Sequence, residues 1–207
     1  MAIDYKMMAI TRKRHFSIPS FTNYIRINNF ELVVEEIKEK KLIGECAELG
    51  VYKGEFAKYI NVAFPDKKLY LFDTFEGFDT KDVAVEQKNN FSTGEQDFSN
   101  TSINEVLNKM KIPDNCIIKK GWFPESLEGL EETFCFVSLD ADLFKPIYDG
   151  LEYFYPRLVK GGYIFVHDYN NDLYSGAKEA VRTFCQKNNI PYVPISDSWG
   201  TVVIGKA

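Results

Sequence analysis

Acidic side chains follow two apolar stretches in the second half of the chain. Asp140 ends the run FVSLD, and Asp142 follows two residues later. His167 and Asp168 come directly after the run YIFV. If the two runs are adjacent parallel strands, their carboxyl ends meet at one edge of a sheet and these side chains converge. Oxygen-rich clusters bind Mg²⁺ or Mn²⁺, so the pattern predicts a divalent metal at Asp140 and Asp168, with His167 as a ligand or a base.

Such a cluster can activate an alcohol. A hydroxyl group has a pKa far above 7 and is a poor nucleophile until a metal polarises it or a base removes its proton. Asp142 is the expected base, and His167 is the other catalytic candidate. A second interpretation stays open, in which the acids cap helices; it applies most directly to Asp142, which lies just before a helix that Pro146 is expected to open.

A glycine-containing loop follows the first expected strand, in the string ECAELGVYKGEF. Glycines allow tight turns and close approach of a ligand, and the N–H groups at a helix start bind carboxylates. Glu48 is suited to an ammonium group, so Glu48, Gly50 and Gly54 together indicate an amino-acid moiety. The spacing departs from the GxGxxG dinucleotide motif. The alternative is an ordinary strand-to-helix turn.

Two further strand ends are suited to a nucleoside. Asp73 follows the apolar run LYLF, where an acid can accept hydrogen bonds from ribose hydroxyls; it is otherwise a turn or cap residue. Gly121 and Trp122 follow the third strand. Gly121 permits close backbone approach, and Trp122 is either a packing surface for adenine or a core residue.

The elements that must position these residues alternate along the chain. Apolar runs predict strands at 43–49, 68–73, 116–120, 134–140 and 163–166, and helical periodicity falls at 30–40, 55–64, 101–111, 146–155 and 175–188. This alternation predicts an α/β fold with a mainly parallel sheet and helices on both faces. Two last strands, 191–195 and 201–204, are too closely connected to be parallel. A mainly parallel seven-stranded sheet with a C-terminal antiparallel strand resembles the Rossmann-like class I methyltransferase fold. A dehydrogenase-type fold would need another parallel crossover unit at this point.

We divide the chain into an N-terminal arm, residues 1–29, and one domain, residues 30–207. Within the domain, the polar stretch 74–100 is long enough to be a lid. Thr101 or Ser102 is expected to cap the following helix, with Glu105 three residues after Ser102 completing a capping box.

Composition excludes several classes of protein. A net charge of −5 over 207 residues disfavours nucleic-acid binding. No apolar run approaches the roughly 20 residues of a membrane span, and the N-terminus lacks a signal-peptide core, so we expect a cytoplasmic protein. The four cysteines are expected to be small buried hydrophobic residues in a reducing compartment.

Six strings together resemble the macrocin O-methyltransferase (TylF-type) family over residues 42–205: ECAELGVYKGEF, LYLFDTFEGF, GWFPESL, FVSLDADLF, YPRLVKGGYIFVHDYN and GAKEAVRTFC. This resemblance implies S-adenosylmethionine as methyl donor and a sugar hydroxyl as acceptor. It also implies a divalent metal, Mg²⁺ or Mn²⁺, and a general base at Asp142.

The resemblance assigns residues to three sites. It implies metal binding by Asp140 and Asp168, while His167 stands where the family has another acid. Histidine is a good ligand for Mn²⁺ but an uncommon one for Mg²⁺. The expected donor site comprises Glu48, Gly50, Gly54, Asp73, Thr74, Ser102, Gly121, Trp122 and Asp140.

Three alternatives remain at this point. The acceptor could be a catechol-like or other small hydroxylated molecule. The chain could be a nicotinamide-dependent reductase, against which the glycine spacing argues, or a cofactor-binding partner subunit without catalysis. The arm and the polar stretch 74–100 also suggest a homodimer.

Overall fold

The computed structural model describes residues 24–207. Helix α2, Tyr24–Glu39, is helical six residues before the expected start at Phe30. The last part of the expected arm therefore belongs to this helix, and residues 1–23 lie outside the described residues. The buried face of α2 carries Ile27 and Phe30 but also Arg26. That buried charge interrupts the apolar pattern by which a sequence reveals a helix.

Seven described strands form one sheet in the order β3-β2-β1-β4-β5-β7-β6. The first five run parallel, and β7 is antiparallel to both β5 and β6. The predicted topology is thus confirmed, which excludes the dehydrogenase-type sheet. The strands are β1 Glu45–Leu49, β2 Leu69–Asp73, β3 Cys116–Lys120, β4 Phe134–Leu139, β5 Leu158–Val166, β6 Val193–Ile195 and β7 Thr201–Gly205.

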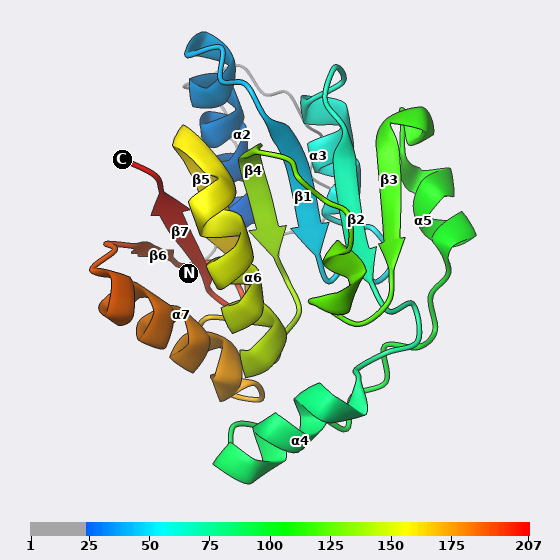
Figure 1. Cartoon of the computed structure of the whole chain (residues 1–207), viewed down its shortest axis with the longest axis vertical. Helices are drawn as coiled ribbons and strands as arrows, with labels where there is room; N and C mark the ends of the chain where they lie inside the picture. Colours follow the sequence, from blue (N-terminus) through cyan, green and yellow to red (C-terminus); the bar gives the residue numbers. More distant parts are fainter. Residues whose placement is uncertain (1–23) are drawn as a thin grey trace, which may run out of the picture.

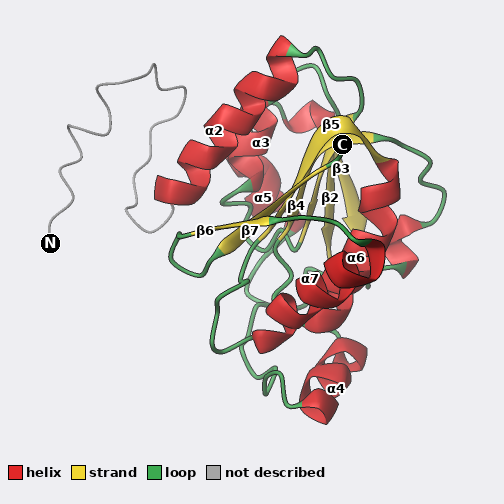
Figure 2. Ribbon diagram, turned by 90° about the vertical axis from the view of Figure 1, so that its left-hand side faces the viewer, coloured by secondary structure: helices red, strands yellow, loops and turns green. Residues whose placement is uncertain are grey.

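Helices cover both faces of the sheet (Figures 1 and 2). One core packs the sheet against α2, α3 (Ala57–Ala63) and α5 (Ile103–Lys109), with Phe30, Ile60 and Val106 fully buried. The other packs it against α6 (Phe144–Arg157) and α7 (Ser175–Asn188), around Leu151 and Phe154. Each such side chain contributes about 1.5–3 kcal/mol by leaving water, so the strand ends rest on a rigid scaffold.

The polar stretch 74–100, which the sequence presents as one long loop, contains regular structure. It contains helix α4, Thr80–Asn89, which lies beyond the carboxyl edge of the sheet (Figure 1). Asp79 caps its first turn, and its buried residues are the acids Asp82 and Glu86. Because the buried positions are acidic, the helix lacks the apolar stripe from which a helix is predicted in a sequence.

Glu86 also explains where α6 begins. Its Oε1 accepts a hydrogen bond from the Phe144 N–H at 2.6 Å. A carboxylate at a helix start stabilises the free N–H groups there. The helix therefore begins two residues before Pro146, the expected opening residue. Strand β5 is likewise longer than expected, because Gly161 and Gly162 pair with Lys206 instead of turning the chain.

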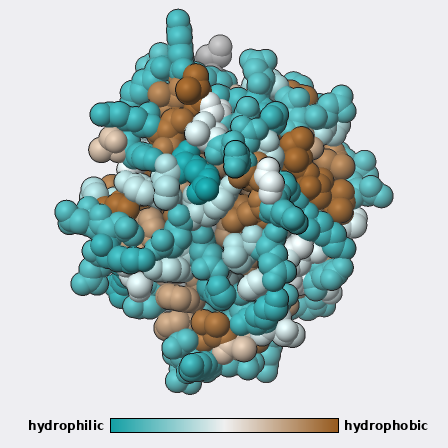
Figure 3. All heavy atoms as spheres, viewed as in Figure 1, coloured by the Kyte–Doolittle hydropathy of each residue, from teal (hydrophilic) through white to brown (hydrophobic). Residues whose placement is uncertain are grey.

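The surface and the cysteines fit an ordinary globular domain. On the face seen in Figure 3, hydrophilic residues dominate and apolar residues form separate patches. None of the described helices is long and apolar enough to cross a membrane. Cys46, Cys135 and Cys185 are buried, Cys116 is half-buried, and all four are free thiols, as predicted.

Candidate active site

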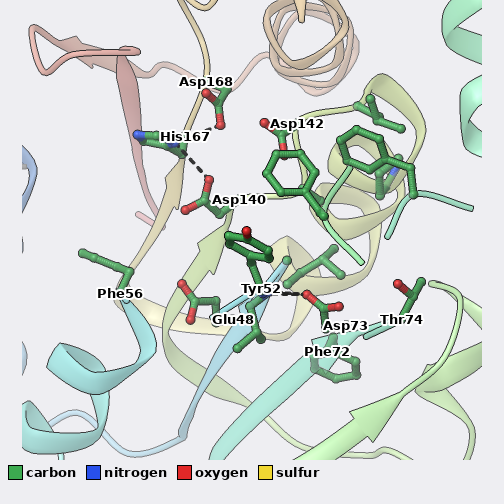
Figure 4. A pocket seen from close by; sticks show the side chains of 18 of the residues that line it. Glu48, Tyr52, Phe56, Phe72, Asp73, Thr74, Asp140, Asp142, His167 and Asp168 are labelled. Carbon is green, nitrogen blue, oxygen red and sulfur yellow. Dashed lines mark hydrogen bonds and ion pairs between the residues drawn. The ribbon is translucent and has the colours of Figure 1, made fainter. Parts of the chain in front are cut away.

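The carboxyl ends of β1, β2, β4 and β5 border one cavity of about 560 Å³. Figure 4 shows the acidic cluster at one end of it, Asp73 and Thr74 at the other, and Tyr52 and Glu48 between them. Most of the predicted site residues line this cavity: Glu48, Gly50, Asp73, Thr74, Gly121, Trp122, Asp140, Asp142, His167 and Asp168.

Gly54 and Ser102 are not among the lining residues. A Cβ at Gly54 would lie 3.1 Å from both Val106 and Met110, so this glycine lets the loop pack on α5. Ser102 caps α5 as predicted, its Oγ accepting from the Glu105 N–H at 3.1 Å. The structure thus places both residues in the scaffold around the site.

Gly50 lines the cavity, but the scaffold also requires it. Its φ is +82°, and a Cβ there would lie 2.2 Å from the Asp140 carbonyl oxygen. Any side chain would therefore push β1 away from β4. The glycine brings the first strand end close to the acidic one.

Asp73 fastens the loop after β1 to the end of β2. Its Oδ2 accepts hydrogen bonds from the Val51 and Tyr52 N–H groups, both at 2.8 Å, and its Oδ1 accepts from the Phe75 N–H at 2.6 Å. Carboxylate oxygens have two acceptor sites each. Its Oδ2 already accepts two hydrogen bonds and its Oδ1 accepts one, so Asp73 can hold the loop and still accept one further hydrogen bond from a ligand. Thr74 beside it closes a turn by donating to the Gly77 carbonyl.

Glu48 is a buried carboxyl group with one oxygen that lacks a hydrogen-bond partner among the described residues. It is 1% exposed, and that oxygen is Oε2. Burial, together with the nearby Asp140 carboxylate, raises the pKa of Glu48 well above its ordinary value. A cationic group bound beside Oε2 would supply the missing partner and favour the charged form.

Trp122 is half-buried in the cavity wall and is not a core residue. Its Nε1 donates to Asp82 Oδ2 at 3.0 Å, and the Lys81 ammonium lies 3.8 Å from the ring centroid. Asp82 also lines the cavity, and its Oδ1 lacks a partner within residues 24–207. Burial raises the pKa of Asp82 to about 6.

The acidic end of the cavity is organised around His167. Its Nδ1 lies 2.9 Å from Asp140 Oδ1 and 2.8 Å from Asp168 Oδ2 (Figure 4). These three residues form a group that could hold a metal ion. The sequence therefore predicted correctly that β4 and β5 bring them together.

Each member of this group has an outer partner. Arg26 Nη1 donates to Asp140 Oδ2 at 2.9 Å, while its guanidinium lies 3.9 Å from the Phe56 ring centroid. Asn171 Nδ2 donates to Asp168 Oδ1 at 2.9 Å. Asp197 Oδ2 lies 4.0 Å from His167 Nε2. One oxygen of each carboxylate in the group is thus held from outside, and the other faces His167.

Charge coupling within the cluster is strong. Burial alone would lower the pKa of His167, but Asp140 and Asp168 outweigh it and raise the pKa to about 10. Burial opposes ionisation of Asp140, yet His167 and Arg26 hold its pKa well below the usual range. Burial, then the Asp168 and Asp140 carboxylates, raise the pKa of Asp142 well above normal. Without a further cation, Asp142 therefore retains its proton.

The backbone is also unusual here. Asp142 and Asp168 have φ values of +57° and +59°, in the left-handed region that few residues other than glycine adopt. Such conformations cost roughly 1–3 kcal/mol and persist where the surroundings impose them. Both side chains are thereby turned toward the same space (Figure 4).

Sequence reasoning missed four polar residues of the site. Arg26 fell within the expected arm, and Asp82 within the expected lid. Asn171 and Asp197 lie in loops with no motif around them. One sequence signal could have identified Arg26. Its spacing from Ile27 and Phe30 is helical, so a helix with these two residues on its buried face also carries Arg26 on that face.

The strand order, with a cavity across the carboxyl ends of the parallel strands, defines a class I methyltransferase. A family model described as Macrocin-O-methyltransferase (TylF) matches residues 13–203. The chain belongs to this family and is an S-adenosylmethionine-dependent O-methyltransferase.

Curated relatives agree with that assignment, and a solved structure shares the fold. An 8-demethyl-8-(2,3-dimethoxy-alpha-L-rhamnosyl)-tetracenomycin-C 4'-O-methyltransferase of Streptomyces olivaceus is 26% identical over 190 residues, covering 86% of this chain and 71% of the relative. Mycinamicin III 3''-O-methyltransferase of Micromonospora griseorubida is 25% identical over 187 residues, covering 80% and 69%. The structure of the O-methyltransferase NovP superposes with a TM-score of 0.70 at 23% identity, covering 88% of this chain and 80% of NovP.

Proposed function

We propose that this enzyme transfers a methyl group from S-adenosylmethionine to a hydroxyl of a sugar or glycoside, assisted by a divalent cation. The observation that carries the proposal is one cavity with two chemically distinct ends. One end offers partners for an amino acid and a nucleoside, and the other gathers the groups that activate a hydroxyl. The curated relatives, whose names specify methylation of glycosylated natural products, support a sugar acceptor.

The donor lies across the ends of β1, β2 and β3. Glu48 Oε2, which lacks a protein partner, accepts from the donor's ammonium group. Asp73 Oδ1, which has one acceptor site left, accepts from a ribose hydroxyl, and adenine lies against Trp122. Asp82 Oδ1 then accepts from the exocyclic amine of adenine, which gives this buried oxygen the hydrogen bond it lacks.

The cluster at β4 and β5 fits a divalent cation. Asp140, His167 and Asp168 would hold the ion through one ligand atom each, and these atoms lie within 4.8 Å of one another. Outer partners that orient each ligand are a regular feature of metal sites. When bound, such a cation polarises the acceptor hydroxyl and lowers its pKa.

Asp142 is the general base of the proposed reaction. Asp142 would lose its proton more readily if a cation were held beside it, because burial and the Asp168 and Asp140 carboxylates keep it protonated, and its carboxylate would then be available. Asp142 takes the hydroxyl proton as the oxygen attacks the sulfonium methyl carbon. The carbon–sulfur bond breaks, and its electron pair remains on sulfur. The products are a methyl ether and S-adenosylhomocysteine.

The proposal is tested by offering methyl glycosides and nucleoside diphosphate sugars with S-adenosylmethionine, after EDTA treatment and with Mg²⁺ or Mn²⁺ restored. Methylated sugar that appears only with a divalent ion is the expected result. Turnover of catechol but of no sugar would overturn the sugar acceptor, and full activity in EDTA would overturn the cation. Three further predictions are a homodimer, a cytoplasmic location and an N-terminal arm before α2. Analytical ultracentrifugation, cell fractionation and truncation before Tyr24 are the respective tests.

A further inference from the structure

The chain contains two tryptophans, and both line the same cavity. Trp122 lies at the end with Asp73 and Gly121, where Asp82 holds its Nε1. Trp199 lies near the acidic end, because its carbonyl oxygen accepts from the N–H of Asn170, two residues after Asp168. Its side chain is 49% exposed, and within residues 24–207 its ring has no aromatic or cation–π partner. A large apolar surface left open beside catalytic groups needs an explanation.

Hydrogen bonds hold the backbone of Trp199 in place. Its carbonyl oxygen accepts from the Asn170 N–H, and the next carbonyl, that of Gly200, accepts from the Tyr169 N–H, both at 2.9 Å. Gly200 has a φ of +77°, and a Cβ there would lie 2.9 Å from Asn170. The turn between β6 and β7 is therefore fixed against the residues that follow Asp168, so the ring does not depend on a flexible loop for its position.

Leu173 is the second exposed apolar residue near the acidic end, because its N–H donates to Asn171 Oδ1 and Asn171 Nδ2 donates to Asp168 Oδ1. It also lines the cavity, and it is 67% exposed. Asp140, Asp142 and Asp168 provide the polar groups of the same space. The acceptor end thus combines an exposed apolar surface with converging carboxylates.

A pyranose ring has matching chemistry. Its hydroxyl groups project around the edge, while its axial C–H bonds form an apolar face that packs on the electron-rich face of an aromatic ring. We infer that Trp199, extended by Leu173, is the platform on which the apolar face of the acceptor sugar stacks, which directs a hydroxyl toward the acidic cluster. This inference rests on the proposed function, because it requires a sugar acceptor.

The first test is kinetic. A sugar that the wild-type enzyme methylates is selected from the panel of methyl glycosides and nucleoside diphosphate sugars. With that sugar, Trp199→Ala is expected to raise KM at least tenfold while kcat and the affinity for S-adenosylhomocysteine change less than twofold. Trp199→Phe, which keeps an aromatic face, should recover most of the loss. Ile43→Ala is the matched control, because Ile43 is 76% exposed and is not a lining residue.

The second test uses each tryptophan as a reporter. In Trp122→Phe, the remaining Trp199 should shift its fluorescence to shorter wavelength when the sugar joins the S-adenosylhomocysteine complex. In Trp199→Phe, the remaining Trp122 should respond to S-adenosylhomocysteine and not to the sugar. An unchanged KM in Trp199→Ala would overturn the platform while leaving the proposed function intact. Absence of any methylated sugar would overturn both.

Discussion

Buried oxygens without partners are the residue-scale signature of this site. Within residues 24–207, Glu48 Oε2, Asp82 Oδ1 and Asp197 Oδ1 are all inaccessible and unpaired. Leaving such an atom unsatisfied costs roughly 1–3 kcal/mol, and more when the group is charged. Glu48 and Asp82 line the cavity, whereas Asp197 lies behind His167. In the proposed function these two oxygens gain their missing partners from the bound donor, and until then they lower the stability of the free protein.

Asp82→Asn should stabilise the unliganded protein at neutral pH. Because the pKa of Asp82 is raised to about 6 from 3.8, its unfavourable burial is absent below pH 3.8 and complete above pH 6. Allowing for solvent screening, the gain should be about 1–2 kcal/mol at pH 7.5 and should vanish near pH 3.8. Urea unfolding at both pH values measures it. A gain that is independent of pH would contradict this explanation.

The same substitution should change which donor analogue binds. Wild type is expected to bind S-adenosylhomocysteine at least tenfold more tightly than S-inosylhomocysteine, whose 6-oxo group cannot donate to Asp82. In Asp82→Asn, the side-chain amide donates to that oxygen, so the preference should disappear or reverse. Isothermal titration calorimetry gives both affinities. Asp172→Asn, at an exposed position outside the cavity wall, is the control; an unchanged preference in Asp82→Asn would place adenine elsewhere.

His167 should govern the choice of metal. An imidazole ligand favours Mn²⁺ or Co²⁺ over Mg²⁺, whereas carboxylates suit Mg²⁺. His167→Asp is therefore expected to narrow the affinity gap between Mn²⁺ and Mg²⁺ by about tenfold or more. Titration of the two ions into the free protein, with Mn²⁺ followed by electron paramagnetic resonance, measures this without turnover. Equal gaps in the two proteins would show that His167 is not a ligand.

Helix α4 shows, at the scale of elements, what sequence patterns miss. Its two buried residues are acids, and Glu86 bridges from α4 to α6 by accepting from the Phe144 N–H and from Ser92 Oγ. An apolar stripe is readable from sequence because hydrophobic burial follows helical periodicity. A helix docked through specific hydrogen bonds leaves no such pattern, and neither does the buried Arg26 of α2.

Strands β2, β4 and the second half of β5, by contrast, could be predicted because they are nearly continuous apolar runs. Asp73 and Asp140 could be placed at the cavity because the residue after such a run lies at the carboxyl edge of the sheet. Outer partners such as Asn171 and Asp197 could not, because loop geometry alone brings them to Asp168 and His167.

Glu86→Ala should release α4 from the body of the protein. The Phe144 N–H then loses its acceptor, and the site of the buried carboxylate is left empty. We expect faster limited proteolysis within residues 74–100 and at least tenfold weaker binding of S-adenosylhomocysteine. Glu86→Gln keeps an acceptor oxygen and should behave close to wild type. If Glu86→Ala is cleaved no faster than Glu86→Gln, the carboxylate is not what docks the helix.

At the scale of the whole molecule, the sheet order determines where chemistry can occur. Placing β1 between β2 and β4, with β5 beyond β4, puts the donor-side strand ends next to the acidic ones. Gly50 permits the close approach of β1 and β4 at that point. A donor and an acceptor that bind these two ends therefore meet near Asp140 and Asp142, and no large rearrangement of the scaffold is needed.

The central claim is that the acidic end activates a hydroxyl beside a bound methyl donor. The most direct measurement is transfer of a deuterated methyl group from S-adenosylmethionine to a sugar, followed by mass spectrometry, in wild type and in Asp142→Asn. Wild type should form the labelled methyl ether. Asp142→Asn should bind S-adenosylhomocysteine within twofold of wild type yet lose at least 100-fold in kcat, because a positioned base contributes roughly 10²–10⁴. Equal turnover by the two proteins would contradict the account.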